Sequence, residues 1–500
     1  MPQQTDSANY RNSRPFDVHV WSEQPRIRDL TNELFEELRQ GIPFRADPEN
    51  HKKHLRVLLL DLYHRYLEDQ EGWIGLSLNR NNYSGPRRYN KLFLAYRPMS
   101  RIVKLLREHG YIEWVRGFHD RSRGVGYQSR IRSGDRLKRI FTGVNEEIGC
   151  LPFNERPPDQ YQEEVLILRD NDGNNIDYLE TDQTRLMRNR LTAYNDFLRG
   201  SYLDVSLRGW DQPERIDLTQ KTLRRIFNNA SWEQGGRFYG GWWENCSRGL
   251  RRRIVISQKP TIEIDYAALH IVLLYARRGI DYWTDGEQAD PYLNERIFRG
   301  PLNSDQHRRL RDAMKTLYLT AINASGPTQA LRGARQDIAK EDATILGEVG
   351  VELGELLTKF NNFHRPIAEY LYSGMGIHLL YVDSLITEHI LDAMLLREGV
   401  PVLPVHDSYV CCVRDDQHLR EAVSEAMDTV LAERGWARVG AKTKEKMGEL
   451  YSNPERERHD GDFFRFDVEE VFADLDHDLE RRQQLWWQSK QQEIINYTPT

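Results

Sequence analysis

Two short stretches decide the fold of this sequence: residues 261–276, TIEIDYAALHIVLLYA, and residues 399–413, GVPVLPVHDSYVCCV. The first predicts a strand that ends at Asp265 and is followed by an apolar helix. In the second, two apolar runs flank His406-Asp407-Ser408, which predicts a tight hairpin with Asp407 at its tip. One aspartate at a strand end is most often a turn former, but two in buried strands indicate a pair of metal ligands.

Paired carboxylates of this kind serve phosphoryl transfer to a hydroxyl group. Two Mg²⁺ ions about 3.5–4 Å apart can be bridged by two carboxylates and can stabilise both the attacking and the leaving oxygen. The sequence therefore predicts a two-ion Mg²⁺ site on Asp265 and Asp407, with Mn²⁺ as an alternative metal.

A basic helix lies between the two stretches, in residues 307–326, HRRLRDAMKTLYLTAINASG. Arg308, Arg311 and Lys315 recur at helical spacing and share one face, while apolar residues occupy the other. Guanidinium and ammonium groups bind phosphates through charge-assisted hydrogen bonds. This face is therefore predicted to hold a triphosphate near the two aspartates.

Taken in order, the three segments resemble motifs A, B and C of family A DNA polymerases and of single-subunit phage-type RNA polymerases. Asp265-Tyr266 is similar to the DNA-polymerase form of motif A, and the Arg311/Lys315 spacing is similar to motif B, which binds the incoming triphosphate. His406-Asp407-Ser408 is similar to the RNA-polymerase form of motif C.

The resemblance also implies roles for other residues. In GGRFYGGWWENCSRGLR, residues 235–251, Arg237 occupies the place of an arginine that touches the template–primer minor groove. Tyr266 would offer its backbone carbonyl to a metal, and His406 would contact the primer end or hold the hairpin by a hydrogen bond. His270 and Asn323 would line the sugar pocket.

The sugar pocket departs from the family pattern at both positions. His270 stands where DNA polymerases carry a glutamate, and Asn323 stands where the family places an aromatic ring. Tyr266 favours deoxynucleotides, whereas the His-Asp-Ser form of motif C favours ribonucleotides. Deoxynucleotides are the expected substrate, and an RNA polymerase or primase is the alternative.

The region from Arg97 to Arg139 contains about a dozen Lys and Arg residues against four acidic ones, as a polyanion-binding surface would. Its pattern predicts a helix and then a β-ribbon. Residues 105–113, LLREHGYIE, and 129–141, SRIRSGDRLKRIF, resemble winged-helix modules of plasmid-type replication initiators; the alternative is a small α+β packing module. The resemblance implies phosphate and groove contacts by Arg101, Lys104, Arg121, Arg123, Arg130 and Arg132.

The chain has 500 residues, a net charge of −6 and a mean hydropathy of −0.71. It contains no apolar run near the roughly 20 residues of a membrane helix and begins without an apolar leader, so no membrane association and a cytoplasmic location are expected. Four scattered cysteines favour neither a zinc site nor a disulfide framework.

The expected fold class is α+β: a right-hand polymerase palm, with an antiparallel sheet and helices, plus an N-terminal winged helix-turn-helix. The predicted function is a template-directed nucleotidyltransferase that takes nucleoside triphosphates and a DNA or RNA template–primer. A non-catalytic DNA-binding replication initiator with a degenerate palm is the alternative from another class. The expected divisions are a tail and helix (1–50), a winged-helix-like module (51–145), a helical thumb-like connector (159–231), a palm with reduced fingers (232–451) and an acidic C-terminal helix (452–500).

Overall fold

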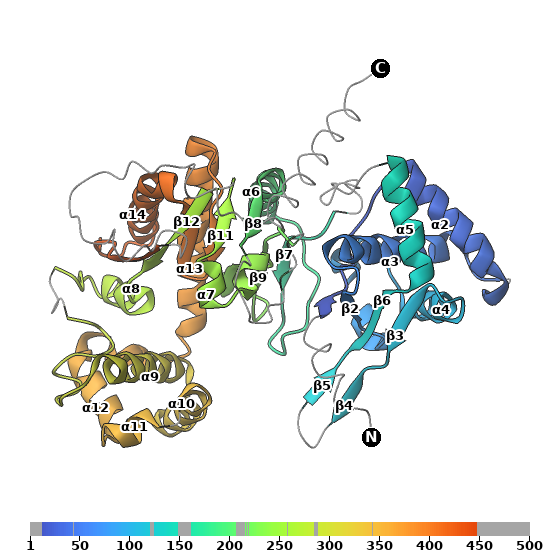
Figure 1. Ribbon diagram of the computed structural model, residues 1–500. Helices are drawn as coiled ribbons and strands as arrows, with labels where there is room; N and C mark the ends of the chain where they lie inside the picture. Colours follow the sequence, from blue (N-terminus) through green and yellow to red (C-terminus); the bar gives the residue numbers. More distant parts are fainter. Residues whose placement is uncertain are drawn as a thin grey trace, which may run out of the picture.

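The computed structural model describes residues 13–447, except 44, 121–124, 149–161, 207–215, 217, 219, 258, 285–288 and 343. The fold is mixed α+β and has two hydrophobic cores, which lie side by side in Figure 1. Residues 13–148 form the N-terminal unit around one core, and residues 162–447 form the sheet unit around the other. No helix in the described ranges is long and apolar enough to cross a membrane.

The N-terminal unit packs helices against a small sheet with strand order β1-β2-β6-β3. The antiparallel part, β2-β6-β3, carries a two-stranded ribbon between β3 and β6, as the sequence predicts. The elements are α2 (Pro25–Leu38), α3 (Pro48–Glu68), α4 (Tyr96–Glu108), α5 (Asp135–Ile148), β1 (Ser13–Pro15), β2 (Trp73–Leu76), β3 (Ile112–Val115), β4 (Phe118–Asp120), β5 (Val125–Tyr127) and β6 (Ser129–Ser133).

The main sheet of the sheet unit has the order β13-β14-β12-β11-β8, and β15 also pairs with β12. All of these pairings are antiparallel. The strand predicted to end at Asp265 is β12, and the hairpin predicted around His406-Asp407 is formed by β13 and β14. The strands are β8 (Leu203–Val205), β11 (Ile254–Ile256), β12 (Lys259–Tyr266), β13 (Leu403–Val405), β14 (Ser408–Cys412) and β15 (Thr443–Met447).

The expected helical connector over residues 159–231 shares the core of the sheet unit. Its long helix is α6 (Asp182–Gly200). Its described part also supplies β8 to the main sheet and two strands to a second sheet of order β10-β9-β7. These two strands are β7 (Leu166–Leu168) and β9 (Arg224–Phe227), and β10 (Gly235–Tyr239) follows the segment. The described part of the segment therefore packs within the sheet unit, and its role as a thumb-like connector stays a prediction.

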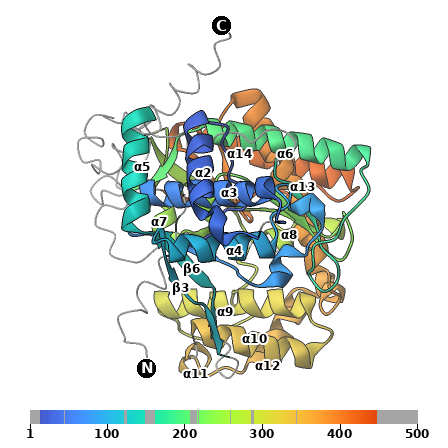
Figure 2. The same cartoon turned by 90° about the vertical axis from the view of Figure 1, so that its right-hand side faces the viewer.

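Some helices of the sheet unit flank the main sheet, and others form a separate lobe. Figure 1 shows α13 and α14 beside β12, and the yellow α9 to α12 gathered below α8. Figure 2, turned by 90°, brings the N-terminal unit in front of the sheet unit. The helices are α7 (Arg248–Arg251), α8 (Leu269–Arg277), α9 (Ser304–Asn323), α10 (Pro327–Glu341), α11 (Ile345–Glu348), α12 (Leu353–Phe363), α13 (Gly376–Ala393) and α14 (Asp416–Glu433).

Candidate active site

The structure brings Asp265 and Asp407 together at one end of adjacent strands. Asp265 on β12 lies opposite Ser408, the first residue of β14, so Asp407 in the turn is its diagonal neighbour. The backbone N–H of Tyr266 donates to the carbonyl oxygen of Asp407 at 3.2 Å. We define these two aspartates as the acidic centre.

The hairpin turn holds Asp407 in an uncommon backbone geometry. His406 has φ +57°, the left-handed region that tight hairpin turns normally fill with glycine. Its ring packs edge-on against Tyr239, with 6.1 Å between ring centroids. A non-glycine residue retained in this conformation is typical of functional turns, where the surrounding structure offsets the strain.

Charge is incompletely balanced at the acidic centre. Burial raises the pKa of Asp265 above its ordinary value, and the nearby Asp407 raises it further, while Lys446 and Lys315 oppose the shift. Two carboxylates of like charge thus approach each other in a partly desolvated place. A bound cation would relieve this repulsion directly.

The donor set fits Mg²⁺ in its usual mode. Among the described residues, no group of three or more His, Cys, Asp and Glu side chains is placed to hold a metal. Mg²⁺ does not need such a cage, because it is commonly held by one or two carboxylates together with substrate phosphates and water. Asp265 and Asp407 provide those carboxylates, so the site fits Mg²⁺ shared with a phosphate-bearing substrate.

The predicted triphosphate helix, α9, presents its cations to this centre. Lys315 is exposed and makes no hydrogen bond or ion pair within the described part of the chain, yet its charge acts on Asp265, His270 and His406. Arg311 donates from Nε to Asp290 Oδ2 at 2.7 Å. Arg308, the third cation predicted on this face, pairs with Asp305 at 2.6 Å. Of the three, only Lys315 is therefore uncommitted within the described part of the chain.

Arg237 lies inside the site in an ion pair that the sequence did not predict. Its Nε donates to Asp383 Oδ2 on α13 at 2.5 Å. Gly236, with φ +78°, makes this approach of β10 to α13 feasible, since a Cβ there would lie 2.9 Å from Ser384 Oγ. Arg237 is 14% exposed and Asp383 fully buried, so the pair is a fixed part of the site.

Asp383 is one of the site residues missed in the sequence. Its Oδ1 has no hydrogen-bond partner within the described residues, and burial, with the charge of Asp407, raises its pKa to about 6 although Arg237 opposes the shift. The available signal was a single carboxylate in the largely apolar run of residues 376–387, a place where buried charge is rare without a partner.

His270 stands next to the Arg237–Asp383 pair. Arg237 Nη2 lies 3.4 Å from His270 Nε2. Burial and the charge of Arg237 lower the pKa of His270 to about 4, so the imidazole is neutral at neutral pH. The predicted sugar-pocket residue is thus close to the acidic centre and uncharged.

Two further sequence assignments are placed less directly. Tyr266 buries its ring and donates its hydroxyl to the Val423 carbonyl at 2.6 Å, which leaves only its backbone for the centre. Asn323 ends α9, is exposed and donates to the Leu319 carbonyl at 3.0 Å. No contact of Asn323 with the acidic centre or His270 occurs in the described ranges, so its role in the sugar pocket stays a prediction.

The predicted nucleic-acid contacts of the N-terminal unit differ in their availability. Lys104 is 61% exposed, and Glu108 at 3.6 Å is its one ion-pair partner among the described residues. Arg101 Nε donates to the Gly41 carbonyl at 2.5 Å. Arg130 is 4% exposed, and its contact with phosphates stays a prediction. Arg132 is committed to Glu71 and Glu113, at 2.7 Å each, and stacks on Trp73. Arg121 and Arg123 lie outside the described residues.

Strand β15 contributes two lysines that the sequence analysis did not identify. Lys444 and Lys446 pair in register with Asp265 and Glu263 of β12. Lys446 Nζ lies 3.0 Å from Glu263 Oε1 and 3.4 Å from Asp265 Oδ2. Glu263 could have been found from its spacing, because residues two apart on a strand share a face; the pairing of β15 could not.

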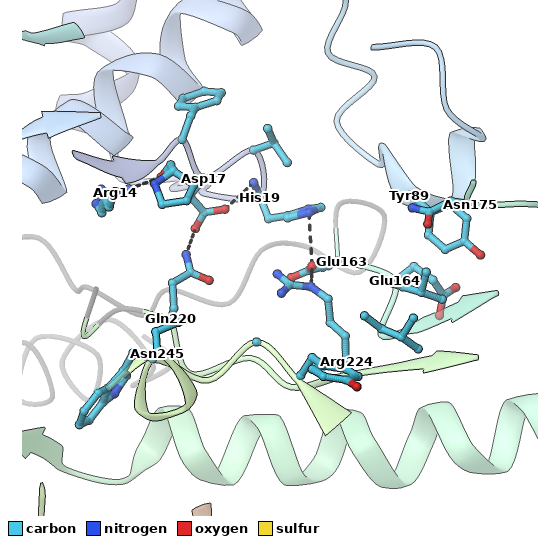
Figure 3. Close-up of a pocket in the computed structure, with 18 of the residues that line it drawn as sticks. Arg14, Asp17, His19, Tyr89, Glu163, Glu164, Asn175, Gln220, Arg224 and Asn245 are labelled. Carbon is cyan, nitrogen blue, oxygen red and sulfur yellow. Dashed lines mark hydrogen bonds and ion pairs between the residues drawn. The ribbon is translucent and has the colours of Figure 1, made fainter. Parts of the chain in front are cut away.

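A hollow of about 520 Å³, apart from the acidic centre, lies between the two units, and Figure 3 labels several of its lining residues. Glu163 links the two sides of this hollow. His19 Nε2 of the N-terminal unit lies 3.3 Å from the Glu163 carboxylate, and Arg224 of the sheet unit donates to the same carboxylate. Gln220 donates to Asp17 at 3.2 Å on the same boundary. These polar pairs join the units, and Tyr239 in the lining connects the hollow to His406.

Comparisons with known proteins give a distant structural likeness. No protein-family model and no curated protein matches the chain. Among solved structures, the chain is similar to the polymerase domain of Pol1 from M. smegmatis in complex with DNA primer-template and dNTP, at 15% sequence identity and a TM-score of 0.28. The likeness covers 53% of this chain and 52% of that one, so the chain spans about half of its neighbour's length.

Proposed function

We propose that this protein is a template-directed nucleotidyltransferase that adds nucleoside triphosphates to a nucleic-acid 3′-end. The observation that carries the proposal is the meeting of Asp265 and Asp407 at one strand end, opposite the cationic face of α9. This arrangement joins a carboxylate pair for metal ions to a phosphate-binding helix. Phosphoryl transfer depends almost entirely on such positioning and charge stabilisation.

Each of these residues has its own proposed role in the reaction. Asp265 and Asp407 would hold Mg²⁺, which when bound supplies charge stabilisation to the reacting oxygens. Lys315 is uncommitted and binds the triphosphate. Arg311 either exchanges Asp290 for a phosphate oxygen of the triphosphate, or it stays bound to Asp290 and holds the helix in place. Tyr266 keeps the strand end in place through its backbone bond to the turn.

Deoxynucleotides are the proposed substrate. His270 is neutral and half-buried, with Arg237 against its Nε2, so it fills space beside the acidic centre without carrying charge. A ring in that place crowds a 2′-hydroxyl more readily than it binds one, because its Nε2 already has a neighbour. Ribonucleotide use, as in an RNA polymerase or primase, is the rival within the same class.

The N-terminal unit is proposed to bind the nucleic acid as a winged helix. The strand order β2-β6-β3, the helix α4 before β3 and the ribbon between β3 and β6 support this assignment. Such modules place a helix in the major groove and a ribbon along the backbone. Lys104 on the exposed side of α4 is the described cation best placed for a phosphate.

Primer extension with the full chain tests the proposal. A labelled primer on DNA and RNA templates would be incubated with Mg²⁺ and either dNTPs or rNTPs, with Asp407→Asn as the inactive control. We expect template-dependent extension by dNTPs that the control lacks. Extension by rNTPs alone would select the RNA polymerase or primase reading, and binding of DNA without any extension would select the non-catalytic initiator.

A further inference from the structure

Strand β15 opposes the acidic strand β12 with a ladder of lysines. Cross-strand partners on one face of a sheet lie close enough to interact directly. Here both acidic residues on that face of β12 have a lysine opposite: Lys446 faces Glu263 and Lys444 faces Asp265. The main sheet thus carries its own cations beside the acidic centre.

Lys446 touches two carboxylates of very different burial. Its Nζ lies 3.0 Å from Glu263 Oε1 and 3.4 Å from Asp265 Oδ2, and the exposed fractions of the three side chains are 25%, 6% and 25% for Lys446, Glu263 and Asp265. Glu263 is also tied to Ser408 Oγ at 2.9 Å and to Arg251 at 3.3 Å. Glu263 is therefore a fixed anchor, whereas Asp265 is the accessible end of the bridge.

The ammonium group cannot stay on Asp265 unchanged when a divalent cation binds that carboxylate. Mg²⁺ binds oxygen at about 2.0–2.1 Å and demands near-octahedral geometry. Two cations on one carboxylate would repel each other at short range. Glu263 offers Lys446 a place to remain, because its contact is the shorter one and it is already ordered by Ser408.

We propose that Lys446 is a built-in counter-ion of the acidic centre, which bridges Glu263 and Asp265 until a divalent cation displaces it from Asp265 onto Glu263 alone. The inference rests on the proposed function, because it takes Asp265 as a metal ligand. It adds a regulatory property: the chain opposes metal binding until a metal–nucleotide complex provides enough attraction to displace the lysine.

Direct metal binding to the full chain, without nucleic acid or nucleotide, tests this inference. Mn²⁺ is titrated while its free concentration is read by electron paramagnetic resonance, and Mg²⁺ binding is measured by calorimetry. Lys446→Met should bind Mn²⁺ about tenfold more tightly than wild type, because one short-range competing charge is gone. Lys446→Arg, which keeps the charge, should stay within about twofold of wild type.

Lys442→Met is the matched control. Lys442 precedes β15 and carries the same charge, but its Nζ lies over the Trp283 ring at 4.4 Å. Its removal should leave Mn²⁺ affinity within about twofold, since the change alters only the longer-range field. An equal gain in Lys442→Met and Lys446→Met would overturn the proposal in favour of a general charge effect.

A double-variant cycle separates displacement from simple repulsion. Glu263→Gln removes the anchor, so Lys446 stays on Asp265 and Mn²⁺ binding should weaken. In the Lys446→Met background the same change should have little effect. An equal weakening in both backgrounds would contradict the proposal, as would unchanged affinity of a folded Lys446→Met or, if that variant does not fold, of Lys446→Gln.

Asp265→Asn distinguishes this inference from the proposed function. Wild-type Mn²⁺ affinity in Asp265→Asn would show that the metal site itself is wrongly placed, and both proposals would fail. Weakened binding in Asp265→Asn with unchanged binding in Lys446→Met and Lys446→Gln would remove only the counter-ion proposal.

Discussion

Two charged regions of this protein follow opposite rules. At the boundary of the units, Arg88 and Arg188 meet Glu164, Glu180 and Asp177 in a network, which we call the boundary network. Arg88 Nε donates to Asp177 at 2.7 Å, and Arg188 Nε donates to Glu164 at 2.9 Å. At the acidic centre two carboxylates of like charge share a strand end, and the nearest ammonium is 3.4 Å from Asp265.

The difference indicates what each region is for. In the boundary network each buried or half-buried charge has an opposite charge at hydrogen-bond distance, as expected of groups that fix the orientation of two bodies. In the acidic centre the shifts in pKa arise from burial and like charge, which raises the free energy of the protein until a cation binds. Such perturbed groups cluster at functional sites.

The largest expected effect comes from the acidic centre. Asp265→Asn or Asp407→Asn should lower nucleotide incorporation by about a thousandfold or more, because each removes a ligand charge from the metals. Without metal at about pH 8, Asp265→Asn should not lower the free energy of unfolding, since burial and Asp407 disfavour the ionised group there. Single-turnover incorporation and urea denaturation measure the two quantities.

The exposed turn residue Asp172 provides the control, as Asp172→Asn should change neither quantity. The comparison of the two regions would be broken if Asp265→Asn destabilised the metal-free protein as strongly as loss of an arginine from the boundary network. Near-wild-type incorporation by either folded variant would remove the metal assignment.

The boundary network should respond in the opposite way. Arg88→Met leaves the carboxylate of Glu164, which is 3% exposed, with one arginine in place of two, and it removes the guanidinium stacked 3.9 Å above the Tyr178 ring. We expect a loss of about 3 kcal/mol in the free energy of unfolding, the usual size for breaking a buried ion pair. Incorporation per folded molecule should change little.

Arg185→Met on the neighbouring surface is the matched control. Arg185 is 54% exposed and, within the described residues, pairs only with Asp182 in the same helix, so its removal should change stability by about 0.5 kcal/mol or less. Urea denaturation of both variants decides the matter. Equal losses in the two would mean that the boundary network is ordinary surface charge.

The sequence predicted the two aspartates at the strand ends better than it predicted the side chains that surround them. Asp265 and Asp407 were found because β-branched and apolar runs mark strands and their ends locally. The register of β12 and β14 places the two aspartates at neighbouring positions, as the sequence predicts. The cationic face of α9 follows from helical spacing alone. The helix expected within residues 1–50 and the helix expected before the ribbon, observed as α2 and α4, were predicted for the same reason, since each carries an apolar stripe.

The site residues that the sequence did not predict depend on contacts between distant segments of the chain. Asp383 meets Arg237 only because β10 packs on α13 through Gly236, and Lys446 reaches Glu263 only through the pairing of β15 with β12. Arg130 appeared to be a surface cation, yet the sheet buries it. Charge count along the chain cannot separate an arginine inside a network from one that faces solvent.

His270 gives the next, smaller effect, and it sharpens the comparison because it is a neutral group inside the charged centre. His270→Ala should change the ratio of kcat/KM for rNTPs and dNTPs by about tenfold, the value of one clash or hydrogen bond of about 1–3 kcal/mol. The expected direction is a gain in ribonucleotide use. Single-nucleotide incorporation with matched dNTP and rNTP measures it.

His378→Ala, an exposed histidine on α13, is the control and should leave the ratio unchanged. An unchanged ratio together with lower stability in His270→Ala would assign His270 to packing with Arg237. The two readings then differ in both measured quantities on the same purified protein.

The smallest expected effect is a difference in response to acid. Hydrogen bonds from Arg188 and Arg88 lower the pKa of Glu180 to about 2, from an ordinary value of 4.5, although burial opposes the shift. Because the folded-state pKa is depressed, the stabilising contribution of Glu180 is complete above about pH 4.5 and is lost as pH falls toward about 2. Glu180→Gln should therefore be less stable than wild type at about pH 7, and the difference should shrink as pH falls through this window.

Asp383 in the active site should have the reverse sign. Its folded-state pKa is raised to about 6, so between its ordinary value of 3.8 and about 6 the folded state takes up more protons and gains stability as pH falls. Urea denaturation of wild type, Glu180→Gln and Asp383→Asn across this range compares the regions directly, with the exposed Glu146→Gln as control. Differences of the same sign for Glu180→Gln and Asp383→Asn would show that the paired boundary and the unbalanced centre are not electrostatic opposites.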